Sequence, residues 1–371
     1  MKQYEYLAKQ ALAEQGIPIP PGRLVNTPDD AAEAVKAIGP AALKAQVLVG
    51  GRGKAGGIRF AQTPEEARET AQAMLGMDLK GYTVERLYAE AKLDIEREFY
   101  ISVTTDRNKK VPLVMASLSG GVEIEDVADS EIVRQWVNPR VGVLPYFGRQ
   151  MAERLGLKGT LAKEFADLVV KLYHIYRERD AELVEINPLA VVDGHLMAAD
   201  ARLNIDDSAL FRHKNVERIE EGSALEKKVH EIGLAYVELD GDIAIMANGA
   251  GMAMATVDAI QYFGGKPANF LDAGGGASVE PTAQALDVLV SMNPKVIFIN
   301  IFGGITRCDD VAKAILQVKQ TTGIPVPLVV RLVGTNEKEG VALLEQAGIS
   351  AYSDMAPAAE RAVQLAGEGR S

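Results

Sequence analysis

The stretch ALKAQVLVGGRGKAGGIRFA, residues 42–61, decides between two folds for the first part of this 371-residue chain. The glycines of GRGKAG match the G-x-G-x-x-G spacing of dinucleotide-binding turns, which lead from a strand directly into a helix. Here the apolar run at 42–49 predicts a strand, and 58–61 predicts a second strand where that helix would have to begin. The pattern favours a flexible loop between two strands, in which Arg52 and Lys54 can close over phosphates. A plain flexible hairpin is the alternative.

The segments around this loop predict a domain of mixed helices and strands. Apolar periodicity and capping residues such as Thr27 predict helices at 4–15, 28–38, 64–75 and 161–179. Runs of β-branched and aromatic residues predict strands at 23–25, 83–91, 97–105 and 111–117, of which the last three resemble one largely antiparallel sheet. Lys44 precedes the glycine loop, and Glu90 and Glu98 lie on the predicted sheet. Taken singly, such charges are most often solvated.

The stretch LVEINPLAVVDGHLMAADARLN, residues 183–204, combines apolar runs with three oxygen-bearing side chains. The runs predict short strands at 183–186, 189–192 and 196–199. Between and beside them stand Glu185, Asn187 and Asp200. Mg²⁺ prefers oxygen ligands and usually takes only one or two from the protein. The stretch is therefore a candidate magnesium site, and a hairpin with polar edges is the alternative.

The second half of the chain changes pattern after a charged segment, 209–229, which we interpret as a linker. Five strand-then-helix units follow at regular spacing and predict a doubly wound parallel sheet with right-handed crossovers. The predicted strands are 243–247, 269–272, 296–301, 326–332 and 349–352.

Glycine turns follow three of these strands, at 248–251, 274–276 and 303–306. In such sheets ligands bind beyond the carboxyl ends of the strands, where free backbone N–H groups and helix N-termini attract anions. A carboxylate or a phosphorylated side chain would fit there. The alternative is that the glycines only permit tight turns. The adjacent Cys308 is expected to be a packed thiol.

Composition narrows the function classes. A formal net charge of −11, with no basic stretch to offset it, argues against a nucleic-acid binder. The single cysteine excludes an internal disulfide framework and fits a reducing cytoplasm. The chain has no signal-like start and no run of about 18 apolar residues. We therefore expect a soluble cytoplasmic protein without membrane contact.

A nucleophile for covalent catalysis is missing from the sequence pattern. None of the four histidines follows a glycine turn, and no serine or cysteine occupies a nucleophile elbow. If the chain takes part in covalent group transfer, we expect the nucleophile to come from another chain.

Five motifs, in this order, resemble the β subunit of succinate–CoA ligase: GGRGKAGG, EINPL, NGAGMAMATVD, GGKPANFLDAGGGAS and NIFGGITRCD. The resemblance begins at Tyr4-Glu5-Tyr6 and runs to near the C-terminus. It implies an α/β chain with an ATP-grasp nucleotide-binding domain, residues 1–225, followed by a flavodoxin-like CoA-ligase domain, residues 226–371.

The resemblance also implies an activity and a partner. The family interconverts succinate, CoA and ATP or GTP with succinyl-CoA, ADP or GDP and phosphate, a step of the tricarboxylic acid cycle. A partner α subunit binds CoA and supplies the histidine that is phosphorylated. The assembly is αβ or α₂β₂, and the resemblance does not decide which.

Residue roles follow from the same resemblance. Residues implied to hold or line the nucleotide are Lys44, Gly51, Arg52, Gly53, Glu90, Leu93 and Glu98. Asn187 and Asp200 are the implied Mg²⁺ ligands, and Glu185 is the implied contact of the phosphohistidine. Residues implied to meet the acyl substrate and the phosphohistidine are Asn248, Gly304, Ile305 and Thr306. Leu93 leaves ATP and GTP open, and Thr306, at a position often apolar in relatives, leaves the acyl group open.

Three alternatives compete with this interpretation. A ligase for another dicarboxylate, such as malate, would share the chemistry and differ in the acyl pocket. A non-catalytic nucleotide-sensing subunit predicts substituted metal and loop residues, but these residues are present. A nicotinamide-dependent dehydrogenase is disfavoured because Met254 stands where the third glycine of NGAGMAM would be needed.

Overall fold

The computed structural model describes residues 1–219, 222–276 and 278–368. These residues belong to two compact units, Met1–Glu221 and Gly222–Ser371, called unit 1 and unit 2 below. The domain boundary expected between residues 225 and 226 stays a prediction.

Unit 1 contains two larger antiparallel sheets and a short ribbon. The smaller sheet has the order β1 (Gly22–Val25), β6 (Leu87–Ala91), β2 (Ala41–Ala45) and β3 (Ile58–Ala61). The larger sheet has the order β11 (His195–Ala198), β10 (Ala181–Val192), β7 (Arg97–Asp106), β8 (Val111–Ser117) and β9 (Val133–Trp136), and β12 (Arg202–Ile205) also pairs with β10. The ribbon pairs β4 (Asp78–Leu79) with β5 (Tyr82–Thr83).

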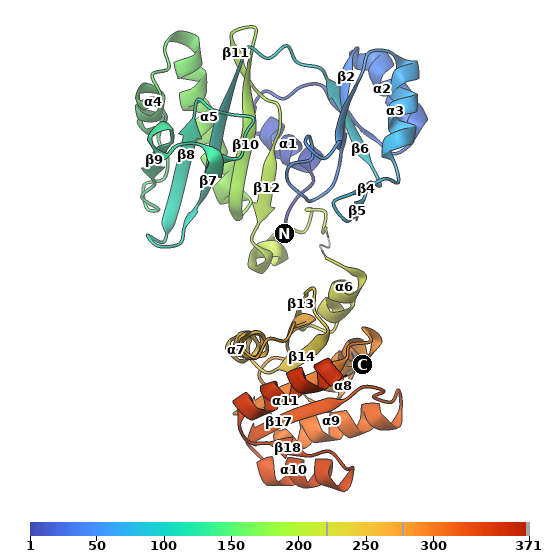
Figure 1. The fold of residues 1–371 in the computed structure, drawn as a ribbon. Helices are drawn as coiled ribbons and strands as arrows, with labels where there is room; N and C mark the ends of the chain where they lie inside the picture. The colour runs from blue at the N-terminus through green and yellow to red at the C-terminus, as the bar shows by residue number, and fades with distance from the viewer. Residues whose placement is uncertain (220–221, 277, 369–371) are drawn as a thin grey trace. The chain divides into compact units, whose positions relative to one another are not determined.

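Helices cover the outer faces of both sheets (Figure 1). The smaller sheet carries α2 (Pro28–Ile38) and α3 (Pro64–Met74), and the larger sheet carries α4 (Pro145–Arg154) and α5 (Gly159–Glu178). Helix α1 (Glu5–Glu14) lies between the two sheets. Short 3₁₀ turns occur at Ile124–Asp126, Asp129–Glu131 and Asp207–Arg212. Thr27 caps α2 as predicted, in a capping box with Asp30.

Each sheet of unit 1 has its own hydrophobic core. Leu43 and Met74 are fully buried between the smaller sheet and its helices. Phe99, Phe165 and Ile186 are buried between the larger sheet and α5, in the core that also contains Leu12 of α1. Because α1 contributes to the second core, its first turn is fixed beside the strands that carry the predicted site residues.

Several sequence predictions for unit 1 were wrong in detail. Residues 83–91, 97–105 and 111–117 do not form one sheet, because β6 pairs with β1 and β2 and not with β7. The strand predicted at 42–49 ends at Ala45. The strands predicted at 183–186 and 189–192 are one strand, β10, whose register with β7 shifts between Ile186 and Leu189. This shift takes Asn187 out of the ladder and leaves its side chain available to the site.

Unit 2 is a mixed, mostly parallel sheet with helices on both faces. The sheet order is β13 (Ala235–Glu238), β15 (Asn269–Asp272), β14 (Ile243–Ala247), β16 (Val296–Gly303), β17 (Leu328–Gly334) and β18 (Ala351–Tyr352). The five parallel strands β14 to β18 therefore have the order 2-1-3-4-5 of flavodoxin-like sheets. The doubly wound fold is confirmed.

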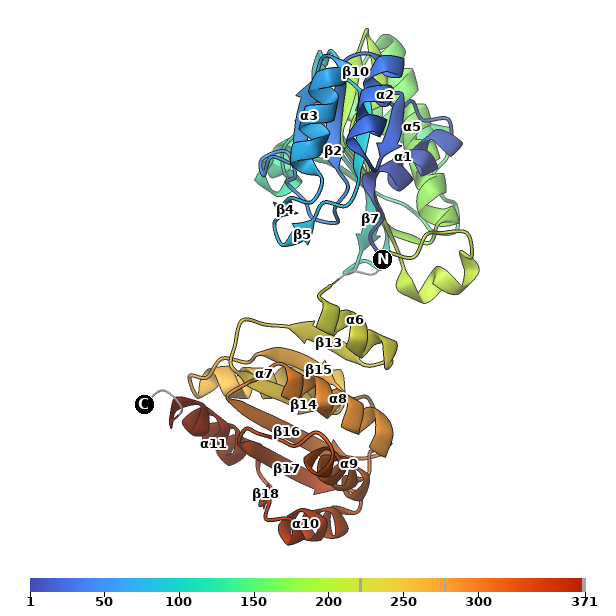
Figure 2. The same ribbon diagram turned by 90° about the vertical axis from the view of Figure 1, so that its right-hand side faces the viewer.

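Figure 2 shows the two helical layers of unit 2. One layer contains α7 (Ala250–Tyr262) and α11 (Met355–Glu368), and the other contains α8 (Val279–Ser291) and α9 (Cys308–Gln320), followed by α10 (Glu337–Gln346). Fully buried Phe298 lies in the first core, while Ile299 and Cys308 lie in the second. The prediction of a packed Cys308 thiol is confirmed.

Two features of unit 2 were not predicted. The antiparallel edge strand β13 extends the parallel sheet. The predicted linker 209–229 contains the start of α6 (Ala224–Glu231), which Ser223 caps with Glu226, and Val229 is fully buried. The high charge density of the segment hid this helix. Residues 220 and 221 of the predicted linker, and residue 277 directly after the second glycine turn, lie outside the described residues. Within the described part of the chain, no helix is long and apolar enough to span a membrane.

Candidate functional site

A cavity of about 270 Å³ in unit 1 brings together most of the residues singled out in that half of the sequence. It is lined by the glycine loop, by the residues near the register shift of β10, by the turn before β12, by the loop after β8 and by the N-terminal segment that includes Glu5. Seven predicted residues line it: Gly51, Arg52, Gly53, Lys54, Glu185, Asn187 and Asp200. Four others do not line it: Lys44, Glu90, Leu93 and Glu98.

The glycine loop connects β2 to β3 without a helix, which confirms that it is not a dinucleotide-binding turn. Gly51 has a φ of 68°, a conformation that glycine adopts without strain. The loop is held by Arg52, which donates to Ala45 O at 3.0 Å and to the Asp200 carboxylate at 3.1 and 3.2 Å. A second carboxylate, Glu5 on α1, lies 2.8 Å from the Arg52 guanidinium.

Lys44 and Glu90 are buried and ion-paired, so the expectation of solvated charges was wrong for both. Lys44 Nζ lies 3.0 Å from Glu5 and donates to Ala199 O at 2.7 Å. Lys9, fully buried, contacts Glu5 at 3.1 Å and also pairs with Glu90. We define the buried charge cluster as three cations and three carboxylates: Lys9, Lys44, Arg52, Glu5, Glu90 and Asp200.

Glu5 and Asp200 have pKa values that are shifted in opposite directions. Burial raises the pKa of Glu5, but the attraction of Lys44, Lys9 and Arg52 outweighs it, and the pKa lies well below its ordinary value. Burial and the Glu5 charge raise the pKa of Asp200 although Arg52 opposes them. The burial that lowers the pKa of Lys44 is outweighed by Glu5 and Glu90, so this ammonium stays charged.

Glu185 faces the cavity from β10 and is held by two neighbours. Its Oε2 accepts a hydrogen bond from the Tyr100 hydroxyl at 3.0 Å, and Arg202 lies 3.5 Å from Oε1. Burial raises the pKa of Glu185, and Arg202 and Tyr100 only partly oppose this. Since the carboxyl is fixed at the cavity wall, it can accept a hydrogen bond from a group that enters.

Asn187 orders the loop that follows β8. Its Oδ1 accepts from the Gly121 N–H at 2.8 Å, and its Nδ2 donates to Val122 O at 2.8 Å. Gly121 has a φ of 72°, and Glu98 occupies the space where its Cβ would lie. Glu98 is therefore linked to the cavity through this loop, whereas Leu93 is half-buried after β6.

The residues predicted in unit 2 gather at the carboxyl edge of its sheet. Asn248 accepts from Phe302 N at 2.8 Å and donates to Phe302 O at 2.9 Å, so it joins the ends of β14 and β16. Buried Thr306 accepts from the Gly276 N–H at 3.0 Å, and Gly304 O accepts from the Thr335 hydroxyl at 2.7 Å. Ile305 has 83% of its surface exposed.

The expectation of free N–H groups at the glycine turns was wrong at three positions. The N–H groups of Gly249 and Gly274 both donate to Asp272, at 2.6 and 2.7 Å, and that of Gly276 donates to Thr306. Asp272, at the end of β15, was not singled out in the sequence because an acid that ends a strand is common. The turns are thus preordered by internal acceptors.

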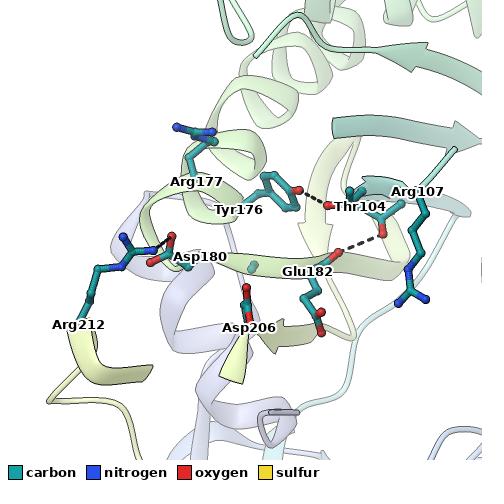
Figure 3. Close-up of a pocket in the computed structure, with 10 residues that line it drawn as sticks. Thr104, Arg107, Tyr176, Arg177, Asp180, Glu182, Asp206 and Arg212 are labelled. Carbon is teal, nitrogen blue, oxygen red and sulfur yellow. Dashed lines mark hydrogen bonds and ion pairs between the residues drawn. The ribbon is translucent and has the colours of Figure 1, made fainter. Parts of the chain in front are cut away.

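A second cavity in unit 1, of about 520 Å³, contains none of the predicted residues (Figure 3). Its lining includes Arg107, Arg177 and Arg212, but also Asp180, Glu182 and Asp206. Arg212 already pairs with Asp180 at 2.9 Å. Because the charges balance, this cavity selects no ligand charge and we do not assign it a function.

Comparisons with known proteins agree with this geometry. Residues 2–191 match the model of an ATP-grasp domain, and residues 246–366 match that of a CoA-ligase domain. Succinate–CoA ligase [ADP-forming] subunit beta of Rubrobacter xylanophilus is 46% identical over 381 residues, covering all of both chains. The chain belongs to the succinate–CoA ligase β-subunit family. The protein of the same name from Natronomonas pharaonis is also 46% identical, over 99% of this chain.

Solved structures support the fold of this family member. The ATP citrate lyase of Methanothrix soehngenii, solved in complex with citrate and coenzyme A, matches with a TM-score of 0.75 over 98% of this chain and 99% of that one. The sequence identity is 20%, so the likeness shows the fold alone. It confirms an ATP-grasp domain followed by a mostly parallel α/β CoA-ligase domain.

Proposed function

We propose that the chain is the nucleotide-binding β subunit of a succinate–CoA ligase, and that ATP is its nucleotide. The observation that carries this proposal is the cavity of unit 1, which combines the glycine loop with Glu185, Asn187 and Asp200 in a chain that matches a family member over all of its length. The relatives named above are ADP-forming, which supports ATP.

Arg52 and Lys44 would neutralise the phosphates. Both cations are kept charged by carboxylates, and the Arg52 guanidinium lines the cavity. The backbone N–H groups of Gly51 and Gly53 can approach phosphate oxygens closely because neither residue has a side chain. Catalysis of phosphoryl transfer is mostly positioning and electrostatic stabilisation, so these groups suffice without a nucleophile on this chain.

The oxygen donors at the cavity fit a magnesium ion. Among the described residues, no three His, Cys, Asp or Glu side chains are grouped to hold a metal. Mg²⁺ needs no such group, since it usually takes one or two protein oxygens and completes its shell with water and phosphate. Asn187 Oδ1 has a lone pair beyond its bond to Gly121, and Asp200 would exchange its bond to Arg52 for the metal. Bound there, Mg²⁺ would offset charge on the nucleotide phosphates.

Glu185 would orient the phosphorylated group. In the proposed function the nucleophile is a histidine of an α subunit, and the Glu185 carboxylate would accept the ring N–H that is not phosphorylated. The hydrogen bond from Tyr100 fixes the carboxylate for this task. A fixed hydrogen-bond acceptor sets the tautomer and orientation of the imidazole.

Unit 2 would bind the carboxylate end of the acyl substrate. The Asn248 and Thr306 side chains and the Gly304 backbone lie at the carboxyl edge of the sheet, where ligands bind in such folds. Asn248 would have to exchange a bond to Phe302 for the substrate.

The experiment is reconstitution with a CoA-binding α subunit, followed by initial rates with succinate, malate and itaconate, each with ATP and with GTP. The proposal predicts the highest kcat/KM for succinate with ATP. A higher kcat/KM for malate than for succinate would contradict succinate as the acyl substrate. A higher kcat/KM with GTP than with ATP would contradict ATP as the nucleotide.

A further inference from the structure

The buried charge cluster contains a carboxylate that the proposed chemistry does not use. Glu5 lies at the first position of α1, and its side chain is 1% exposed. It is the one carboxylate of the cluster that contacts all three cations, at 2.8 Å from Arg52, 3.0 Å from Lys44 and 3.1 Å from Lys9.

The N-terminal segment fixes Glu5 in place. The Met1 ammonium donates to Ile205 O at 2.6 Å, and Gln3 N donates to Leu203 O at 2.9 Å, so the segment is bound to β12. On the other side, Tyr6 N donates to the Gln46 side chain, which in turn donates to Lys44 O. The Glu5 carboxylate is therefore tied to both sheets that border the cavity.

Arg52 has two carboxylate partners that differ in kind. Asp200 has 31% of its side chain exposed and is the partner that a bound magnesium ion would take. Glu5 is buried and would keep its ion pair with Arg52 when Asp200 is occupied. Without Glu5, the guanidinium would lose its fixed partner at the moment when the phosphates require it.

We propose that Glu5 is a positioning residue of the nucleotide site: its carboxylate holds Arg52 at the cavity, and Lys44 beside it, while Asp200 is released to the metal. This inference rests on the proposed function, because it assumes that nucleotide binds in this cavity. Glu5 borders the cavity, but only 1% of its side chain is exposed, so in this role it acts through the two cations.

The direction in which one substitution changes the affinity for phosphates distinguishes this role from two simpler ones. Glu5→Gln keeps the shape and removes one negative charge. If Glu5 were only a nearby charge, its removal would strengthen the binding of anionic phosphates. If it only stabilised the fold, the folded protein would bind as before. Positioning predicts weaker binding, by roughly tenfold or more, which corresponds to the loss of one hydrogen bond between Arg52 and a charged phosphate.

The test is the affinity of the full chain for MgADP, measured by isothermal titration calorimetry. The variants are Glu5→Gln, Arg52→Gln and the double variant, with Glu33→Gln on the exposed face of α2 as the matched control. We expect Glu5→Gln to weaken binding clearly in the wild-type background and much less in the Arg52→Gln background. Glu33→Gln should bind as the wild type does.

Unchanged or tighter binding by Glu5→Gln would overturn the inference, and so would an equal fold-loss in both backgrounds. If Glu5→Gln does not fold, Glu5→Asp replaces it, because it keeps the charge and shortens the reach; wild-type affinity of Glu5→Asp would then overturn the inference. Failure of the wild-type chain to bind MgADP would instead refute the proposed function.

Discussion

Replacement of Asp200 by alanine should separate ligand binding from stability in unit 1. The change removes two hydrogen bonds from Arg52, at 3.1 and 3.2 Å, and one from Ala201 N at 2.7 Å. Breaking a buried ion pair costs about 3–5 kcal/mol when the remaining charge has no other partner. Arg52 still has Glu5 as a partner at 2.8 Å, and the Asp200 side chain is 31% exposed. We therefore expect the free energy of unfolding to fall by about 1.5 kcal/mol, the lower end of the range for hydrogen bonds to charged groups.

The effect on the ligand should be larger than the effect on the fold. Mg²⁺ should increase the affinity for ADP far less in the variant, because Asp200 is the proposed metal ligand. Loss of an outer-shell partner alone typically costs about 10–100-fold in metal affinity, so loss of a direct ligand should cost at least as much. Calorimetric titration with ADP, with and without Mg²⁺, measures this. Trp136, the single tryptophan, lies in unit 1, so its fluorescence during urea unfolding reports the stability of that unit.

Asp29→Ala is the control, because it breaks an exposed ion pair with Arg68 of 2.8 Å and should change neither quantity much. Wild-type Mg²⁺ dependence in Asp200→Ala would refute the metal assignment. A loss of stability above about 4 kcal/mol would refute the inference that Glu5 retains Arg52.

Three further outcomes are expected. Asn248→Ala should raise the KM for succinate in the reconstituted enzyme and leave MgADP affinity unchanged, because Asn248 lies in unit 2; an altered ADP affinity would contradict this separation. Cys308 is fully buried and burial raises its pKa to about 11, so a thiol reagent should label the native chain far more slowly than the urea-unfolded chain, and equal rates would be inconsistent with the fold. The Glu164 carboxylate, which accepts a hydrogen bond from the protonated His195 ring, raises the pKa of His195 above its ordinary value. The small stabilisation from this pair is therefore present below the unfolded-state pKa and disappears as pH rises through the folded-state pKa. An NMR titration should show this pKa fall in Glu164→Gln, and an unchanged value would show that the pair does not form in solution.

The fold of unit 2 was predictable because each of its strand-then-helix repeats is formed by residues that are close in sequence. A strand, a glycine turn and a helix follow one another, and right-handed crossovers then fix the topology. The edge strand β13 was missed because Ala235–Glu238 is short and mostly exposed, so its apolar pattern is weak.

Unit 1 was harder to predict because its sheets are assembled from distant segments. Residues 83–91 read as a neighbour of 97–105, but β6 pairs with β1, more than 60 residues earlier, and with β2. Periodicity identifies strands and cannot identify partners, so the sheet assignment failed where the elements themselves were right.

The site was predictable where a motif carries its own chemistry. EINP and the glycine loop supplied Glu185, Asn187 and Arg52, and the structure places all three at one cavity. Glu5 was not singled out as a site residue, since a glutamate at the start of a helix is ordinarily a favourable surface charge. Its spacing to Lys9, four residues later, was the available signal, and only the fold shows that both side chains are buried.

The most direct test of the proposed division of labour is the transfer of radiolabelled phosphate from [γ-³²P]ATP. With a CoA-binding α subunit present, we expect acid-labile label on a histidine of that subunit, and succinyl-CoA formation when succinate and CoA are added. The chain alone should bind MgATP but acquire no label and form no thioester. Robust succinyl-CoA formation by the pure single chain would contradict the proposal that the phosphorylated histidine belongs to an α subunit.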